Sequence, residues 1–98
     1  MIRYIASMIF RKYFVAGRVQ GVYYRATVAQ RARELRVTGH AINLPDGRVE
    51  VLACGPADAV QALVDFLWKG SSASHVTSVD VSDATLDAAQ CPAGFRTG

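Results

Sequence analysis

Cysteine is scarce in this sequence, with Cys54 and Cys91 the only two among 98 residues. Two cysteines so far apart match neither the close pairs of a metal site nor the dense pattern of a small disulfide scaffold. We therefore expect two free thiols and a reducing compartment.

Long apolar runs are also missing. No run approaches the roughly 20 residues that span a bilayer. Residues 1–10 contain Arg3 and an apolar stretch too short for a secretory signal, without a convincing cleavage site. We expect a cytoplasmic location and no membrane partner.

The chain has only a small excess of charge and no low-complexity or linker segment. Eleven Lys and Arg against eight Asp and Glu give a net charge of +3, and 51% of the residues are hydrophobic. That composition is typical of a single folded domain. Arg31, Arg33 and Arg36 cluster at helical spacing, which favours a solvated helix face over a nucleic-acid patch. We expect no nucleic-acid partner.

The first half of the chain alternates between strand-like and helix-like spacing. Residues 12–17 are typical of a strand, and residues 25–36 have the period of a helix. Residues 40–44 and 48–53 are predicted strands, and the Pro-Asp-Gly turn between them makes the pair a hairpin. The apolar stripe of the helix consists of Tyr24, Val28, Ala32 and Leu35.

The second half begins with another predicted helix. Gly55-Pro56 opens it, because Pro fits the first helical turn, and Lys69-Gly70 closes it. Its expected buried stripe consists of Val60, Leu63, Val64 and Leu67.

Strand spacing returns after this helix. In residues 75–81, three alternating side chains share one face, whereas Val76 falls on the opposite face. Residues 83–93 are expected to form a loop, and residues 94–96 a short final strand. The three alternating side chains are those of Thr77, Val79 and Val81.

The resulting order is strand, helix, strand, strand, helix, strand. Two interleaved βαβ halves in one sheet give a ferredoxin-like α+β sandwich, since right-handed crossovers leave few other arrangements. We predict a βαββαβ fold, with an antiparallel sheet and both helices on one face.

The most informative segment is the glycine-punctuated stretch of residues 17–25, where the first strand leads into the first helix. Such a turn leaves backbone N–H groups unpaired at a helix start, where they are suited to hold an oxyanion. Arg25 adds a planar, permanently charged donor that matches phosphate geometry. The sequence therefore predicts a phosphate-binding cradle.

Two motifs are specific enough to indicate a family. Residues 15–25, Val-Ala-Gly-Arg-Val-Gln-Gly-Val-Tyr-Tyr-Arg, resemble the first signature of the acylphosphatases. Residues 39–50, running on to Gly55, resemble the second. The resemblance extends over nearly the whole chain and implies an acylphosphatase-like domain at residues 8–98, preceded by an extension at residues 1–7.

This resemblance implies hydrolysis of the carboxyl–phosphate bond of small acyl phosphates, giving a carboxylate and inorganic phosphate without a metal or another cofactor. By position, Arg25 resembles the family's phosphate-binding arginine and Asn43 the residue that orients the attacking water. The protein is expected to be a monomer. The implied phosphate-binding loop supplies the backbone N–H groups of Val19, Gln20, Gly21, Val22, Tyr23 and Tyr24.

The implied reaction needs few chemical groups. An acyl phosphate expels a carboxylate, whose conjugate acid has a pKa near ~4–5, so no general acid is required. What remains is to neutralise the phosphoryl charge and to place a water in line with the bond that breaks. Arg25 and the loop amides suit the first task, and the amide of Asn43, both donor and acceptor, suits the second.

Three positions depart from the family pattern. Tyr24 stands where the signature has Phe or Met, so its hydroxyl must find a partner or water. His40 replaces an aromatic residue, and Ile42 replaces one that is often basic. These changes affect packing or substrate access rather than the implied catalytic groups.

Other interpretations remain at this point. Arg25 could be a surface arginine, and Asn43 could belong to the following turn. A ferredoxin-like RNA-binding module would need a basic and aromatic central strand, and a metal carrier would need a Cys-x-x-Cys loop where the chain has residues 20–23. A regulatory domain that binds an acyl or carbamoyl phosphate without turnover is a third alternative.

Overall fold

The structure is a computed structural model that describes residues 8–82 and 91–98. The proposed extension at residues 1–7 lies outside the described residues, as do residues 83–90 of the expected loop. The elements in chain order are β1 (Met8–Arg18), α1 (Tyr24–Glu34), β2 (Thr38–Asn43), β3 (Val49–Pro56), α2 (Ala57–Lys69), β4 (His75–Val81) and β5 (Phe95–Thr97).

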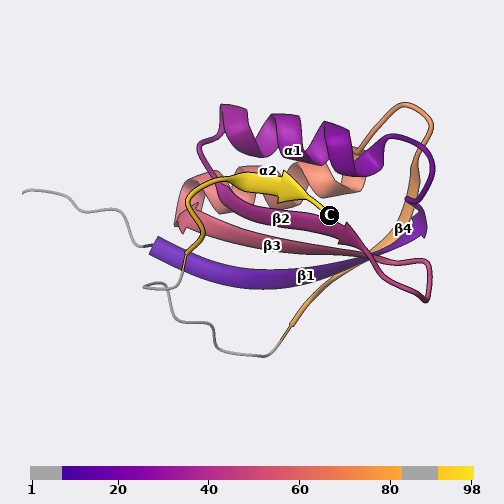
Figure 1. The fold of residues 1–98 in the computed structure, drawn as a ribbon, viewed down its shortest axis with the longest axis horizontal. Coiled ribbons are helices and arrows are strands. Elements are labelled where there is room, and N and C mark those ends of the chain that lie inside the picture. The colour runs from indigo at the N-terminus through magenta and orange to yellow at the C-terminus, as the bar shows by residue number, and fades with distance from the viewer. Residues whose placement is uncertain (1–7, 83–90) are drawn as a thin grey trace, which may run out of the picture.

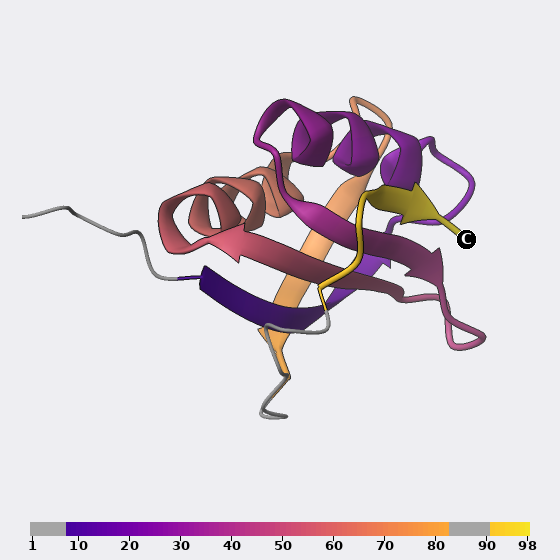
Figure 2. The same cartoon turned by 60° about the vertical axis from the view of Figure 1, so that its left-hand side comes forward.

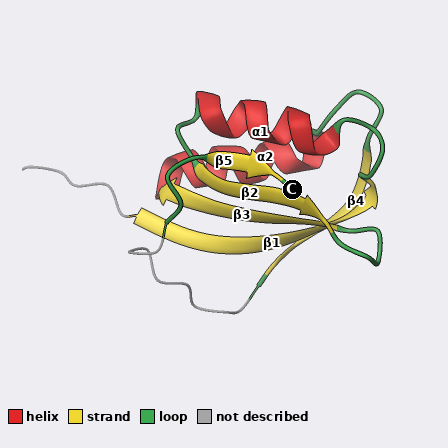
Figure 3. Cartoon of the chain, in the orientation of Figure 1, coloured by secondary structure: helices red, strands yellow, loops and turns green. Residues whose placement is uncertain are grey.

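The described strands form one sheet in the order β4-β1-β3-β2-β5 (Figure 1). The pairs β1–β4, β1–β3 and β3–β2 are antiparallel. The short β5 adds a parallel edge to β2, so the sheet is mixed. Both helices cover the same face of the sheet (Figures 2 and 3). The predicted ferredoxin-like α+β fold is confirmed.

The hydrophobic core lies between the helices and this face of the sheet. Its strand contribution comes from alternating positions, such as Val49, Val51 and Ala53 in β3, which are fully buried. Both helices bury most of their predicted stripes, whereas Leu35 and Val64 are only partly buried. Burial of these apolar faces, at about 25 cal/mol per Å², is the main force that fixes the helices on the sheet.

β4 has the predicted bounds but not the predicted faces. A register shift between Ala16 and Gly17 of β1 places Gly17 opposite Val76 and Ala16 opposite Ser78. This bulge rotates the side chains, so Val76 and Val79 both pack against the core while Thr77 is exposed. The expectation that Val76 faces away from Val79 is therefore wrong.

The sheet face opposite the helices carries a small polar network. His40 Nε2 lies 2.8 Å from Glu50 Oε2, and Lys12 Nζ lies 3.8 Å from Glu50 Oε1. This cross-strand pairing accommodates His40, the second departure from the family pattern. His40 has a structural partner here and lies on the face away from α1.

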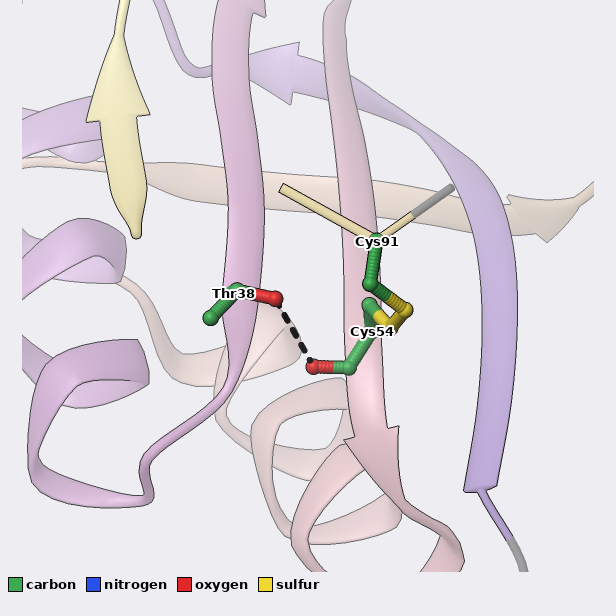
Figure 4. The surroundings of a disulfide bond; sticks show 3 residues. All are labelled: Thr38, Cys54 and Cys91. Atoms are coloured by element: carbon green, nitrogen blue, oxygen red, sulfur yellow. Dashed lines mark hydrogen bonds between the residues drawn. A yellow bond between two sulfur atoms is a disulfide. The ribbon is translucent and has the colours of Figure 1, made fainter. Parts of the chain in front are cut away.

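The two cysteines form a disulfide, and the expectation of free thiols is wrong. Cys54 lies near the end of β3, and Cys91 lies in the segment that leads to β5, with their Cα atoms 5.9 Å apart (Figure 4). Thr38 Oγ1 of the neighbouring strand donates a hydrogen bond to the carbonyl of Cys54. Sequence spacing could not predict this pair, because its members are 37 residues apart and spacing alone does not give connectivity.

We expect the disulfide to stabilise the domain strongly. It closes a loop of 37 residues, for which chain entropy in the unfolded state predicts about 2–4 kcal/mol. Reduction should therefore lower the thermal midpoint by roughly 10 °C or more for a domain of this size. Thermal unfolding with and without reductant measures the effect.

The variant Cys91→Ser is the matched control for this prediction. It should have the lower midpoint already, and reductant should change it no further. Equal midpoints for the oxidised and reduced wild-type protein would contradict a stabilising disulfide.

Candidate active site

The loop between β1 and α1 is shaped by two residues with left-handed backbone. Gly21 has φ +74°, and an added Cβ there would meet nothing within 4 Å, so its backbone angle rather than space favours glycine. Tyr23 has φ +62° and immediately precedes the first helical residue. These reversals turn the chain from the end of β1 into α1 within five residues, 19–23.

This turn leaves its backbone amides available. Among the described residues, the first N–H after β1 to donate a turn or cap bond is that of Thr27, to the carbonyl of Tyr23 at 3.1 Å. The first turn of α1 contains no acidic residue, so no carboxylate neutralises the positive end of the helix dipole. An anion is the ligand that such an arrangement favours.

A cleft of about 360 Å³ opens over this helix start. Five of the predicted site residues line it, namely Val19, Gly21, Tyr23, Tyr24 and Arg25. Ala26 and Thr97 complete the lining. Arg25 therefore lines the same cleft as the loop residues Gly21 and Tyr23.

Gln20, Val22 and Asn43 do not line the cleft. Gln20 instead ties the loop to the β2–β3 hairpin: its Nε2 donates to the carbonyls of Leu44 at 2.9 Å and Arg48 at 3.0 Å. On the other side, the carbonyl of Val22 accepts a 2.6 Å hydrogen bond from Ser71 Oγ. The loop is thus joined to the β2–β3 hairpin by its own Gln20 side chain and to the segment after α2 by the side chain of Ser71.

Asn43 is exposed at the end of β2. Val49 of β3 has Val15 of β1 opposite it on one side and Asn43 of β2 on the other. β1 and β2 therefore run in the same direction, toward the same end of the sheet. Two strand spacings separate β1 from β2, roughly 10 Å. The hydrogen bond from Gln20 to the carbonyl of Leu44 then fixes the loop beside the residue that follows Asn43.

Tyr24 is the first departure from the family pattern, and the structure gives its hydroxyl a hydrogen-bond partner. Its ring is buried, and its hydroxyl donates a 2.7 Å hydrogen bond to the carbonyl of Leu67 in the last turn of α2. Carbonyls in the last helical turn lack an intrahelical partner, so Tyr24 satisfies one of them. Burial raises the pKa of the Tyr24 hydroxyl above its usual value, which keeps it a neutral donor.

Substitution of Tyr24 by Phe should therefore destabilise the domain. The change leaves the carbonyl of Leu67 without this donor, which costs about 1 kcal/mol. For a domain of this size, the thermal midpoint should fall by roughly 4–8 °C. An unchanged midpoint would show that water replaces the hydroxyl.

Sequence reasoning missed Ala26 and Thr97 as parts of this site. Thr97 lines the cleft, and it is placed there by β5, which pairs with β2 and sets Thr97 opposite Ala41 (Figure 2). A Cβ built at Gly98 would lie 3.8 Å from a guanidinium nitrogen of Arg25. A three-residue strand carries too little periodicity to be placed at an active site beforehand.

Among the described residues that line the cleft, Arg25 is the charged one. The turn residue Asp46 accepts hydrogen bonds from the backbone N–H of Arg48 at 3.0 Å and from Arg48 Nε at 2.8 Å, and both hold the pKa of this exposed carboxyl below its usual value.

Residues 8–82 and 91–98 include no group of three or more His, Cys, Asp or Glu side chains placed to bind a metal ion. No helix in those ranges is long and apolar enough to span a membrane.

Comparison with known proteins bears directly on this site. A family model described as acylphosphatase matches residues 11–97. The acylphosphatase of Chromohalobacter salexigens is 53% identical over 73 residues, covering 74% of this chain and 81% of that protein. That of Alkalilimnicola ehrlichii is 45% identical over 86 residues, covering 88% and 93%.

Solved structures agree with the sequence relatives. The crystal structure of acylphosphatase from Bacillus subtilis superimposes with a TM-score of 0.82 at 34% identity, covering 94% of this chain and 99% of that one. The match to the family model covers the β1–α1 loop and α1, whose residues line most of the cleft, and also the β2–β3 hairpin. The chain belongs to the acylphosphatase family, enzymes that hydrolyse acyl phosphates.

Proposed function

We propose that this chain hydrolyses small acyl phosphates without a metal, using Arg25 and the amides of residues 19–24 to bind the phosphoryl group and Asn43 to orient the attacking water. The observation that carries the proposal is Arg25 in a cleft at an uncapped helix start. A permanently charged, forked donor at Arg25 belongs to the same cleft lining as the loop residues Gly21 and Tyr23, which supports the proposal.

Phosphoryl binding is the first step. The guanidinium of Arg25 forms two parallel hydrogen bonds to phosphoryl oxygens, and the loop amides hold the remaining charge. These donors are fixed before substrate binds, because Gln20 and Ser71 pin the loop. Preorganised donors stabilise the extra charge of the transition state without reorganising during the reaction.

Water attack is the second step. The Asn43 carboxamide accepts a hydrogen bond from the water and can donate one to a phosphoryl oxygen, so it sets the direction of attack. The water oxygen forms a bond to phosphorus as the bond from phosphorus to the carboxylate oxygen breaks. The water's proton passes to a phosphate oxygen, and the electron pair leaves with the carboxylate.

The leaving group accounts for the proposed independence from metals. A carboxylate is stable as an anion at neutral pH, so neither a Lewis acid nor a general acid has to assist its departure. Arg25 supplies positive charge where many phosphoryl-transfer enzymes use a metal cation.

We further propose that the protein acts as a monomer in the cytoplasm, on small substrates rather than on nucleic acid or membranes. The disulfide removes one basis for the cytoplasmic prediction, because such bonds persist mainly in oxidising compartments. Cell fractionation tests the location: the protein should be recovered with cytoplasmic markers, and recovery in a secreted or periplasmic fraction would contradict the proposal.

Release of inorganic phosphate from acetyl phosphate tests the reaction and its metal independence together. We expect turnover that is unchanged after dialysis against EDTA. Loss of turnover on chelation, restored by Mg²⁺ or Zn²⁺, would contradict the metal-free mechanism. Tight binding of acyl phosphate without turnover would instead favour a regulatory domain.

A further inference from the structure

Tyr23 occupies an unusual position for its residue type. It has φ +62°, a left-handed conformation that side chains other than Gly, Asn and Asp rarely adopt. It is also the N-cap of α1, and its side chain makes no capping hydrogen bond. Asn would suit both the dihedral angle and the cap better. Local structure therefore gives no reason for a tyrosine here.

The ring of Tyr23 is not placed there by the hydrophobic core. The residue is 83% exposed, although it is one of the larger hydrophobic residues in the described part of the chain. Its backbone is nevertheless fixed: the carbonyl accepts hydrogen bonds from Thr27 N at 3.1 Å and from Thr27 Oγ1 at 2.9 Å. An exposed aromatic ring thus stands on an anchored, strained backbone position, a combination that indicates function.

Tyr23 lines the candidate active-site cleft. Arg25 and the loop residue Gly21 line it beside the start of the helix. Tyr23, Ala26 and Thr97 belong to the same lining. An acyl phosphate with its phosphoryl group at Arg25 needs a surface for its acyl group, and these three residues provide an aromatic and small-residue wall.

We infer that Tyr23 is a specificity-determining residue whose ring contacts the acyl group and favours planar aromatic acyl phosphates over acetyl phosphate. This inference rests on the proposed function. An aryl group gains offset-stacked or edge-to-face contacts with the tyrosine ring in addition to burial of apolar surface, whereas an acetyl group is too small for either. The phosphoryl contacts are common to both substrates, so the difference lies in the acyl group.

The test compares benzoyl phosphate with acetyl phosphate in wild type, Tyr23→Asn and the matched control Tyr23→Phe. Asn keeps the left-handed backbone and can cap α1, so this variant loses the ring while the fold is retained. We expect the ratio of kcat/KM for benzoyl phosphate to that for acetyl phosphate to fall about three- to tenfold in Tyr23→Asn. Tyr23→Phe should keep the wild-type ratio.

Two results would overturn the inference. One is an unchanged ratio in Tyr23→Asn, whether or not both activities fall, since a purely structural role affects both substrates alike. The other is a ratio in Tyr23→Phe as low as in Tyr23→Asn, which would assign the effect to the hydroxyl. Failure of the proposed function is a different result, because wild type would then hydrolyse neither substrate.

Discussion

Substitution of Arg25 by Ala should abolish turnover, lowering kcat/KM by on the order of 10²–10³-fold or more. The reason is the position of Arg25, which lines the cleft at the start of α1 and, in the proposed mechanism, supplies the positive charge that binds the phosphoryl group. Inorganic phosphate should bind more weakly to the same variant. Phosphate release from acetyl phosphate and product inhibition by phosphate measure the two effects.

Arg25→Lys separates geometry from charge. A lysine keeps the charge but offers a point-like ammonium in place of a planar fork, so it should recover little of the lost activity. Arg31→Ala on the same helix is the matched control, because Arg31 pairs with Glu34 on the exposed surface at 3.1 Å. Near-normal activity in Arg25→Lys would contradict the two-pronged contact with phosphate.

Replacement of Asn43 by Ala should lower kcat by roughly 10²-fold, the usual scale for a misplaced reactant. Its proposed contact is to the attacking water, so binding of inorganic phosphate should change little. Asn43 is exposed at the end of β2, and the change should leave the thermal midpoint close to that of wild type. Steady-state kinetics together with the inhibition constant of phosphate distinguish these quantities.

Asn43→Asp is a useful second variant. It keeps the size of the side chain but removes the N–H donor and adds negative charge next to the phosphoryl group, so kcat should fall at least as far as in Asn43→Ala. A loss of phosphate affinity equal to the loss of kcat in Asn43→Ala would make Asn43 a binding or scaffold residue instead.

Most of the fold could be predicted because it depends on local periodicity. The stripe through Tyr24, Val28 and Ala32 and the alternation through Val49 and Val51 correspond to buried faces. These patterns, joined by recognisable turns, leave few ways to assemble one sheet and two helices.

The rest depends on contacts between distant segments. The β-bulge opposite Ala16 and Gly17 changes which side chains of β4 face the core, and no local pattern in β4 predicts it. The pairing of Cys54 with Cys91 joins residues 37 apart in the sequence. In each case, a tertiary contact overrides what spacing alone suggests.

The same distinction applies to the site. The loop and Arg25 were predictable because glycine spacing and a charged residue at a helix start carry a physical meaning of their own. The support by Gln20, the hydroxyl partner of Tyr24 and the approach of Thr97 each join positions more than 20 residues apart. Only the folded chain brings these pairs together.

The central claim is that Arg25 and the amides of residues 19–24 hold the phosphoryl group. An NMR titration of the ¹⁵N-labelled protein with inorganic phosphate tests it most directly. We expect saturable shifts centred on the backbone amides of residues 19–26 and on Arg25 Nε, with both lost in Arg25→Ala. Saturable shifts centred elsewhere, or unaltered binding in Arg25→Ala, would contradict the account.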